Sequence, residues 1–207
     1  MVNRLASATL GLLLLGGISL AHADAQKVVH PMRGTINQVS AKALDITTAR
    51  GDKHLHVQLT DQTKVAVVTN AGFKDIKPDS YIGSAAIPQP DGTLKALEVH
   101  VFAPSMKGTG EGHYGWENAD GSMGTMTNGS VGSFVKSSGR TLVVDYNGQQ
   151  KKLTVPENVP IVSLAPGSHS DLKAGEKLVL FPTADSQNDD LVADRISVGR
   201  DGVAPPM

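Results

Sequence analysis

The sequence contains no cysteine, so neither a disulfide framework nor a thiolate metal site can form. Aromatic residues are few, with three Tyr, four Phe and one Trp among 207 residues. No charge of one sign dominates, because 19 basic and 20 acidic residues leave a formal net charge of −1. Since a nucleic-acid binder combines a basic surface with stacking rings, the composition argues against that class. Stability has to come from packing.

Long apolar runs are also missing, except at the N-terminus. Residues 1–4 carry positive charge, residues 9–20 form a short apolar run, and small residues follow at Ala23 and Ala25. This order predicts a secretory signal peptide over residues 1–25, cleaved after Ala23 or after Ala25. The alternative is an uncleaved anchor, but a membrane span needs roughly 20 apolar residues. We expect a mature protein that is periplasmic or secreted and has no membrane span.

Alternation of apolar and polar residues marks the rest of the chain. Leu44 and Ile46 share one strand face, and Leu97, Val99 and Val101 share another. Such alternation is typical of half-buried strands, and turn residues such as those at 90–92 separate the runs. No stretch of ten residues carries a helical stripe. The sequence predicts an all-β fold.

The alternating pattern occurs twice. The segment from Gly34 matches that from Gly132 at an offset of 132 − 34 = 98, and Asp75 matches Asp171 at 171 − 75 = 96. A repeated unit of about 70 residues with five or six strands predicts a small closed barrel of the OB-like or SH3-like kind. We therefore expect two tandem barrels related by internal duplication. Because so small a unit is marginal without disulfides or metal, the two copies should pack on each other.

The predicted domain organisation follows from this repeat. It comprises the signal peptide at 1–25, a first barrel at 26–103, a Gly-rich connector at 104–129, and a second barrel at 130–207 that ends in a short proline-containing tail. Insertions between the copies are expected in turns.

The connector contains KGTGEGHYGW, residues 107–116. A dinucleotide loop needs G-x-G-x-x-G before a helix, whereas this spacing is G-x-G-x-G with no helix to follow. The phosphate-loop interpretation therefore fails. We expect Tyr114 and Trp116 to pack in the seam between the barrels, and His113, Tyr114 and Trp116 are the candidate binding residues.

Two sets of side chains could hold a metal. Soft ligands in the connector (Met106, His113, Met123 and Met126) would suit Cu(I), although a long loop is more often an ordered or functional connector. In the first copy, His54 and His56 share one strand face, as do Glu98 and His100. If these four met on the outer surface of a barrel they could bind Zn or Cu(II). The alternative is that they are ordinary polar residues on solvated faces, and the second copy favours it: the equivalent residues there are Gln150, Lys152, Arg195 and Ser197.

No catalytic residues are predicted. Asp189 and Asp190 have the sequence context of a turn, and His169 lies in a Gly/Ser loop without an evident partner. No spacing brings a nucleophile, a base and an orienting group together.

Four segments in order carry a family resemblance: PQPDGTLKALEVHVF, SMKGTGEGHYGW, TMTNGSV and the ending VGRDGVAPPM. Together they resemble a family of exported proteobacterial proteins with duplicated small β-barrel domains of unknown function. The resemblance covers the mature chain and implies the two-barrel fold and export, but no activity or catalytic residue. Some members carry names of the metal-transporter permease type, whereas a permease needs several spanning helices.

The sequence therefore predicts a non-enzymatic exported module that binds a protein or a small ligand, with no cofactor. The alternative is a periplasmic copper or zinc binding protein, and the third hypothesis is a hydrolytic or transferase enzyme. A deep pocket with converging polar groups would favour this enzyme hypothesis.

Overall fold

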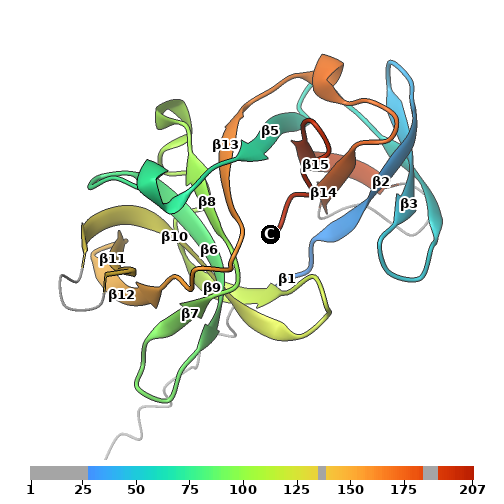
Figure 1. Ribbon diagram of the computed structural model, residues 1–207. Helices are drawn as coiled ribbons and strands as arrows, with labels where there is room; N and C mark the ends of the chain where they lie inside the picture. Colours follow the sequence, from blue (N-terminus) through green and yellow to red (C-terminus); the bar gives the residue numbers. More distant parts are fainter. Residues whose placement is uncertain (1–27, 135–138, 184–190) are drawn as a thin grey trace, which may run out of the picture.

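The computed structural model describes residues 28–134, 139–183 and 191–207, and these residues form an all-β protein (Figure 1). The strands before the connector are β1 (Val28–Val29), β2 (Met32–Val39), β3 (Ala43–Thr48), β4 (His54–Gln58), β5 (Lys64–Asn70), β6 (Tyr81–Pro88), β7 (Leu94–Ala96) and β8 (Val99–Phe102). The later strands are β9 (Gly112–Glu117), β10 (Met123–Phe134), β11 (Thr141–Tyr146), β12 (Gln149–Thr154), β13 (Ile161–Pro166), β14 (Lys177–Pro182) and β15 (Leu191–Gly199). Three short 3₁₀ turns are η1 (Phe73–Asp75), η2 (Pro104–Met106) and η3 (His169–Asp171).

Within these ranges no helix is long and apolar enough to cross a bilayer. The predicted signal peptide, 1–25, and the predicted turn at Asp189 and Asp190 lie outside the described residues.

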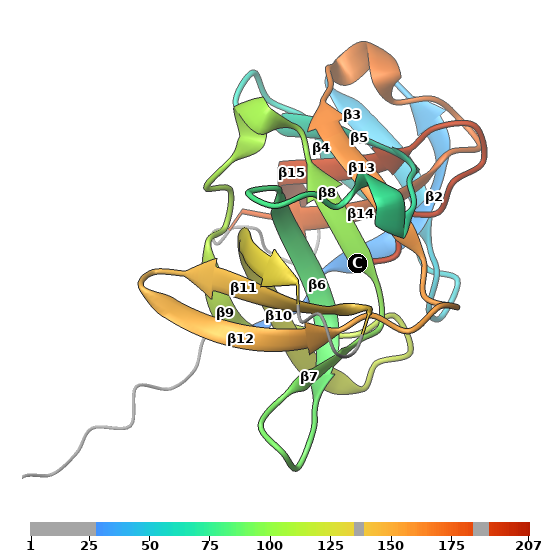
Figure 2. The same cartoon turned by 60° about the vertical axis from the view of Figure 1, so that its left-hand side comes forward.

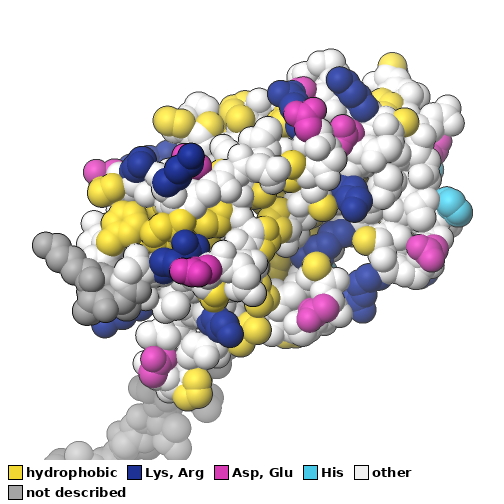
Figure 3. Space-filling model, in the orientation of Figure 1, with side chains coloured by type: hydrophobic (Ala, Val, Ile, Leu, Met, Phe, Trp, Pro, Cys, Tyr) yellow, Lys and Arg dark blue, Asp and Glu magenta, His cyan; other side chains and the backbone are white. Residues whose placement is uncertain are grey.

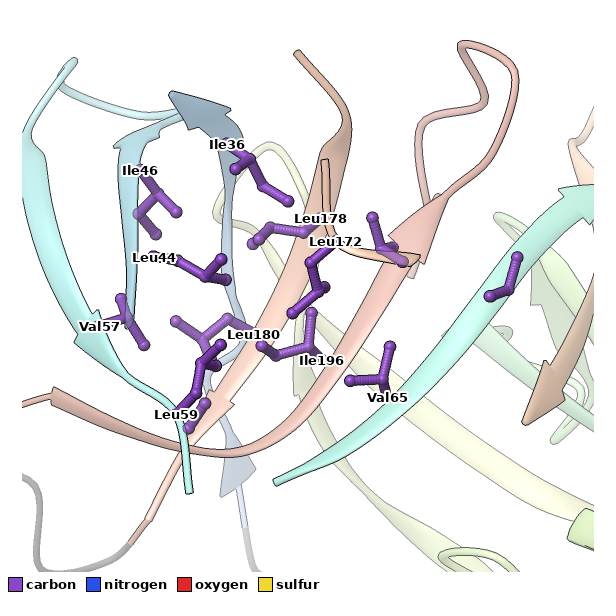
Figure 4. Close-up of a cluster of buried hydrophobic side chains, with 13 residues drawn as sticks. Ile36, Leu44, Ile46, Val57, Leu59, Val65, Leu172, Leu178, Leu180 and Ile196 are labelled. Atoms are coloured by element: carbon purple, nitrogen blue, oxygen red, sulfur yellow. The ribbon is translucent and has the colours of Figure 1, made fainter. Parts of the chain in front are cut away.

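The first strand group consists of β2, β3, β4, β14 and β15. β2, β3 and β4 form an antiparallel meander, β14 pairs with β2, and β15 pairs with β14 and, at two residues, with β4. Their inward side chains form one hydrophobic cluster, which includes Leu44, Ile46, Leu180 and Ile196 (Figure 4). Leu44 and Ile46 are fully buried, which confirms the sharing of one face predicted for them. Each such side chain contributes about 1.5–3 kcal/mol.

The second strand group consists of β6, β7, β10, β11 and β12. β10, β11 and β12 form an antiparallel meander, β6 pairs with β10 and with β7, and β7 pairs with β12. This group encloses a second cluster, with Ile82, Leu142, Val144 and Leu153 at its centre. The two groups lie side by side (Figure 2).

Each group takes strands from both parts of the sequence. β2 to β4 precede the connector but pair with β14 and β15, which end the chain; β10 to β12 follow the connector's start but pair with β6 and β7. The predicted domains, 26–103 and 130–207, are therefore not separate packing units, and the division needs correction. Alternation fixes which face of a strand is buried, but it does not fix which strand lies beside it.

β5, β13 and β8 join the two groups into one mixed sheet. β5 pairs with β15 and with β13, and β13 pairs in turn with β8. A third cluster lies between the groups and contains Val68, Phe102, Trp116, Met126 and Val179. The central strands are consequently buried on both faces.

The predicted connector, 104–129, contains regular structure, which is a second correction. It includes β9 and the first half of β10, the longest strand. Glycine supplies backbone freedom here, because Gly108, Gly110 and Gly112 all have positive φ angles (89°, 60° and 144°). The G-x-G-x-G spacing thus guides a left-handed backbone path into β9.

Glu117, at the end of β9, ties this segment to the start of the chain. Its carboxylate accepts hydrogen bonds from His30 Nδ1 and Arg50 Nη1, both at 2.6 Å. The hydrogen bond from His30 and the nearby Arg50 charge lower the pKa of Glu117. A lowered pKa stabilises the fold above the ordinary glutamate pKa of about 4.3, and this contribution is lost as pH falls through the lowered value.

The substitution Glu117→Gln should therefore make the free energy of unfolding less dependent on pH in the acidic range. We expect the urea midpoint of the unmodified protein to fall more between about pH 6 and about pH 3.5 than that of the variant. The effect should shrink in high salt, because these groups are exposed. Glu157→Gln is the control, since no hydrogen bond or ion pair of Glu157 is found among the described residues. Equal acid sensitivity in all three proteins would contradict the role of Glu117.

Candidate functional site: a central cavity

A cavity of about 890 Å³ opens between the two strand groups. Small-molecule sites commonly measure about 300–1,000 Å³. Hydrophobic side chains gather in the middle of the face shown in Figure 3. Its lining includes four of the chain's eight aromatic rings, Phe102, Tyr114, Trp116 and Phe181.

One wall comes from β5, β15 and β14. Alternate residues of these strands, such as Val65 and Ile196, point into the first cluster. The residues between them therefore face the cavity. A row across the three strands follows from the register: Lys64 lies opposite Arg195, and Arg195 lies opposite Phe181.

Aromatic rings continue this wall onto β9. The ring centroid of Phe181 lies 6.0 Å from that of Trp116, which lies 6.5 Å from that of Tyr114. The Arg195 guanidinium carbon lies 4.5 Å from the Phe181 centroid, a cation–π geometry. Burial raises the pKa of the Tyr114 hydroxyl, so this group stays protonated and can donate a hydrogen bond.

The opposite wall is built around Gly83. His100 on β8 and Asn128 on β10 are its register neighbours on the two sides. A Cβ at Gly83 would come within 2.0 Å of His100 Nε2 and 2.2 Å of Asn128 Oδ1. Glycine is required here because the two neighbouring side chains occupy its side-chain space.

Glu98 holds His100 in place from behind. The side chains of Glu98 and His100 are 1% and 5% exposed, and His100 Nδ1 lies 3.1 Å from Glu98 Oε2. Glu98 Oε1 also accepts the backbone N–H of Ala85 at 2.6 Å. A carboxylate that accepts from both partners can be buried without leaving an unsatisfied charge.

Hydrogen-bonding capacity remains in the cavity wall. Asn128 Nδ2 donates to the carbonyl of Gly110 at 2.9 Å and to Tyr114 Oη at 3.1 Å. Asn128 Oδ1 and Trp116 Nε1, however, have no hydrogen-bond partner within the described residues. Buried polar atoms in this state are uncommon, so the cavity wall has spare hydrogen-bonding capacity.

The last residues of the sequence close one side of the cavity. Met207 is 3% exposed and belongs to the third cluster. Arg33 Nε donates to its backbone oxygen at 3.0 Å, while Arg33 Nη2 donates to the carbonyl of Glu117 at 2.9 Å. Burial lowers the pKa of Arg33. Pro205 and Met207, in the segment predicted as a short tail, are therefore buried.

The predicted binding residues divide between two faces of β9. Tyr114 and Trp116 line the cavity between the two strand groups, whereas the His113 side chain points to the opposite face of β9. His113 Nδ1 hydrogen-bonds Thr127 Oγ1 at 2.8 Å, its ring lies near that of Tyr146, and burial lowers its pKa. The three residues do not form one site.

The soft-ligand set is divided in the same way. Met126 packs in the third cluster, and its register partner is Tyr114. Met106 packs against the same cluster, whereas Met123 is 55% exposed. His113 faces the opposite side of the strand pair, so these side chains do not form a Cu(I) site.

The predicted His54, His56, Glu98 and His100 site needs correction as well. His54 and His56 are exposed on β4 and hydrogen-bond Thr47 and Asp45, respectively. Glu98 and His100 do share a strand face, as predicted, but both are buried, and His100 lines the central cavity rather than an outer surface. Across residues 28–134, 139–183 and 191–207, no three His, Asp or Glu side chains are placed to hold a metal ion.

Comparisons of the chain with protein-family models, with curated proteins and with solved structures found no match. Sequence reasoning missed Lys64, Phe181, Asn128 and Arg195 as residues of the cavity wall. Phe181 could have been noticed because it is one of only four Phe residues in the chain. The sequence around Lys64, Asn128 and Arg195 has no feature that would predict a place in a cavity wall.

Proposed function

We propose that this chain is an exported, non-enzymatic protein that binds a small ligand in its central cavity. The central cavity carries the proposal, because it combines a ligand-sized volume, four aromatic rings and polar groups with spare hydrogen-bonding capacity. Export rests on the signal-peptide pattern of residues 1–25.

The polar groups of the wall support binding rather than catalysis. In the described structure His100 is hydrogen-bonded to Glu98 alone, and Gly83 and Asn128 crowd its Nε2 edge. Asn128 donates hydrogen bonds to Tyr114 and to the carbonyl of Gly110. This is a network that rigidifies a pocket, without a nucleophile beside a base.

We also infer that the two strand groups are closed barrels that arose by duplication, with strands exchanged between the copies. The support is repeated pairing: β4 with β15 repeats β12 with β7, and β14 with β2 repeats β6 with β10. η1 and η3 have the same cap, in which Asp75 or Asp171 accepts the backbone N–H three residues earlier at 2.8 or 2.9 Å.

The pairing also revises the alignment of the first strand. Gly34 pairs with Leu178 and Gly129 with Ile82, and a Cβ at either glycine would collide with the carbonyl of the neighbouring strand, Thr47 or Asp145. Gly34 therefore corresponds to Gly129, at 129 − 34 = 95, rather than to Gly132. The three-residue difference is absorbed in the following turn, where insertions are tolerated.

The single tryptophan makes the cavity testable, since Trp116 lies in its wall. We expect N-phenyl-1-naphthylamine, a neutral apolar dye, to bind saturably at one site and to quench Trp116 emission by energy transfer. Ser105→Phe, at the exposed rim of the cavity, should weaken binding by about tenfold or more, because the ring takes up space that the dye needs.

Ala174→Phe is the matched control, because Ala174 is exposed in a turn and does not line the cavity. It should leave dye binding unchanged. Absence of saturable binding to the unmodified protein, or equal binding by both variants, would refute a ligand site in this cavity.

A further inference from the structure

We propose that the ligand is an amphipathic anion: a flat apolar body that carries one carboxylate, sulfonate or phosphate group. This inference rests on the proposed function of the cavity and adds the chemical class of its ligand. Lys64 and Arg195 would bind the anionic group, and the aromatic wall would hold the apolar body.

The two cations lie side by side by register. Lys64 on β5 and Arg195 on β15 are direct partners in a parallel strand pair, and both line the cavity. Their side chains therefore leave the sheet on the same face, a few ångströms apart. Like charges placed directly opposite each other destabilise a sheet, and a bound anion would remove that cost.

Neither cation is neutralised well by the protein itself. Lys64 has no hydrogen bond or ion pair within the described residues. Arg195 Nε lies 3.4 Å from Asp194 Oδ2, and these two side chains are 42% and 54% exposed. An exposed pair of this kind contributes little, so the guanidinium keeps donors for a ligand. Arg presents its donors as a planar fork, a geometry that suits carboxylate and phosphate oxygens.

The apolar body has a surface beside these charges. Arg195 lies over the Phe181 ring, which contacts Trp116. Met126 and Leu164 continue the lining, and flexible Met side chains adapt to ligands of different shape. The cationic pair, Lys64 and Arg195, is thus continuous with the aromatic wall that contains Phe181 and Trp116.

The acidic residues that line the cavity do not neutralise the charges of Lys64 and Arg195. Glu111 accepts the backbone N–H of Asn147 at 2.9 Å and is therefore engaged by the second strand group. Burial and the charge of Glu111 raise the pKa of Tyr81, whose hydroxyl donates to the carbonyl of Thr109, two residues before Glu111, at 3.2 Å. The other acidic residue of the lining is Asp194, which forms the exposed pair with Arg195 described above.

Two dyes with the same ring system test the charge requirement. 8-Anilino-1-naphthalenesulfonate carries a sulfonate, whereas N-phenyl-1-naphthylamine lacks it. We expect the sulfonate dye to bind more tightly, measured by Trp116 energy transfer and by calorimetry, and to weaken as ionic strength rises. Lys64→Gln and Arg195→Gln should each weaken it by about tenfold, since each removes a charged hydrogen-bond donor. Neither should alter binding of the neutral dye.

Lys177→Gln is the charge-matched control, on an exposed strand position outside the cavity. A thermal melt of each variant tests whether it is folded, because a collapsed chain would also bind the dye. If both dyes bind equally and the Gln variants change neither, the cavity binds ligands but the anionic class is wrong. If neither dye binds, the proposed function fails too.

Discussion

Glu98→Ala should lower the free energy of unfolding by about 3–5 kcal/mol. Glu98 is 1% exposed and accepts hydrogen bonds from Ala85 N and His100 Nδ1. Removal of the carboxylate leaves both of these buried donors without a partner and opens a space behind the cavity wall. Urea unfolding at neutral pH, followed by Trp116 fluorescence and circular dichroism, measures the loss.

The chain contains a matched control for this prediction. His56 and Asp45 form the same kind of pair, with Nδ1 to Oδ1 at 2.7 Å, but their side chains are 62% and 48% exposed. Asp45→Ala should cost less than about 1 kcal/mol, because water replaces the lost partner. Glu98→Gln keeps the volume and one acceptor and should cost less than Glu98→Ala. Equal costs for Glu98→Ala and Asp45→Ala would show that burial of the Glu98–His100 pair does not set its contribution.

These two pairs show which structural features can be predicted from the sequence and which cannot. Alternation predicted that His54 and His56 would lie opposite Leu55 and Val57, and that Glu98 would lie opposite Val99; both predictions are confirmed. The environment of each polar face was not predictable. β4 lies at the surface, whereas β8 has the second cluster on one face and the third cluster on the other, and strand periodicity has the same appearance in both situations.

The cavity could not be predicted from the sequence, for a related reason. Its cationic pair joins Lys64 to Arg195, which are 195 − 64 = 131 residues apart and meet only because β15 lies beside β5. The internal sequence alignment matches the segment of β15 with that of β8 and gives no indication that β15 lies beside β5. Local patterns determine strands and turns, such as the caps at Asp75 and Asp171. Register between distant strands is determined by the packing of the whole chain.

The pairing of strands that are distant in sequence also has a consequence for folding. The first cluster contains Leu44 from the start of the sequence and Ile196 from its end, and the second contains Ile82 and Leu142. Neither cluster is complete until both parts of the chain have met. Such long-range pairing raises the loop-closure entropy that precedes stable contacts. The central cluster, which joins the groups, therefore has a large share in the stability of the whole.

Trp116 is the largest side chain in that central cluster, and Trp116→Ala should destabilise the protein by about 3–5 kcal/mol. Trp116 is 3% exposed and contacts the rings of Tyr114 and Phe181. Its loss leaves a void between the two strand groups, which the flanking β9 and β14 cannot close without shifting. Because the variant has no tryptophan, the urea midpoint must be read by far-ultraviolet circular dichroism.

Two substitutions separate this packing effect from other causes. Trp116→Phe should cost less than about 1.5 kcal/mol, because a ring remains and the indole nitrogen has no hydrogen-bond partner in the described structure. Met123→Ala, at a 55% exposed side chain on neighbouring β10, should change stability by less than about 0.5 kcal/mol. A small cost for Trp116→Ala, similar to that for Met123→Ala, would mean that the two strand groups are held together without the central ring cluster. A large cost for Trp116→Phe would instead assign the stabilisation to the indole N–H.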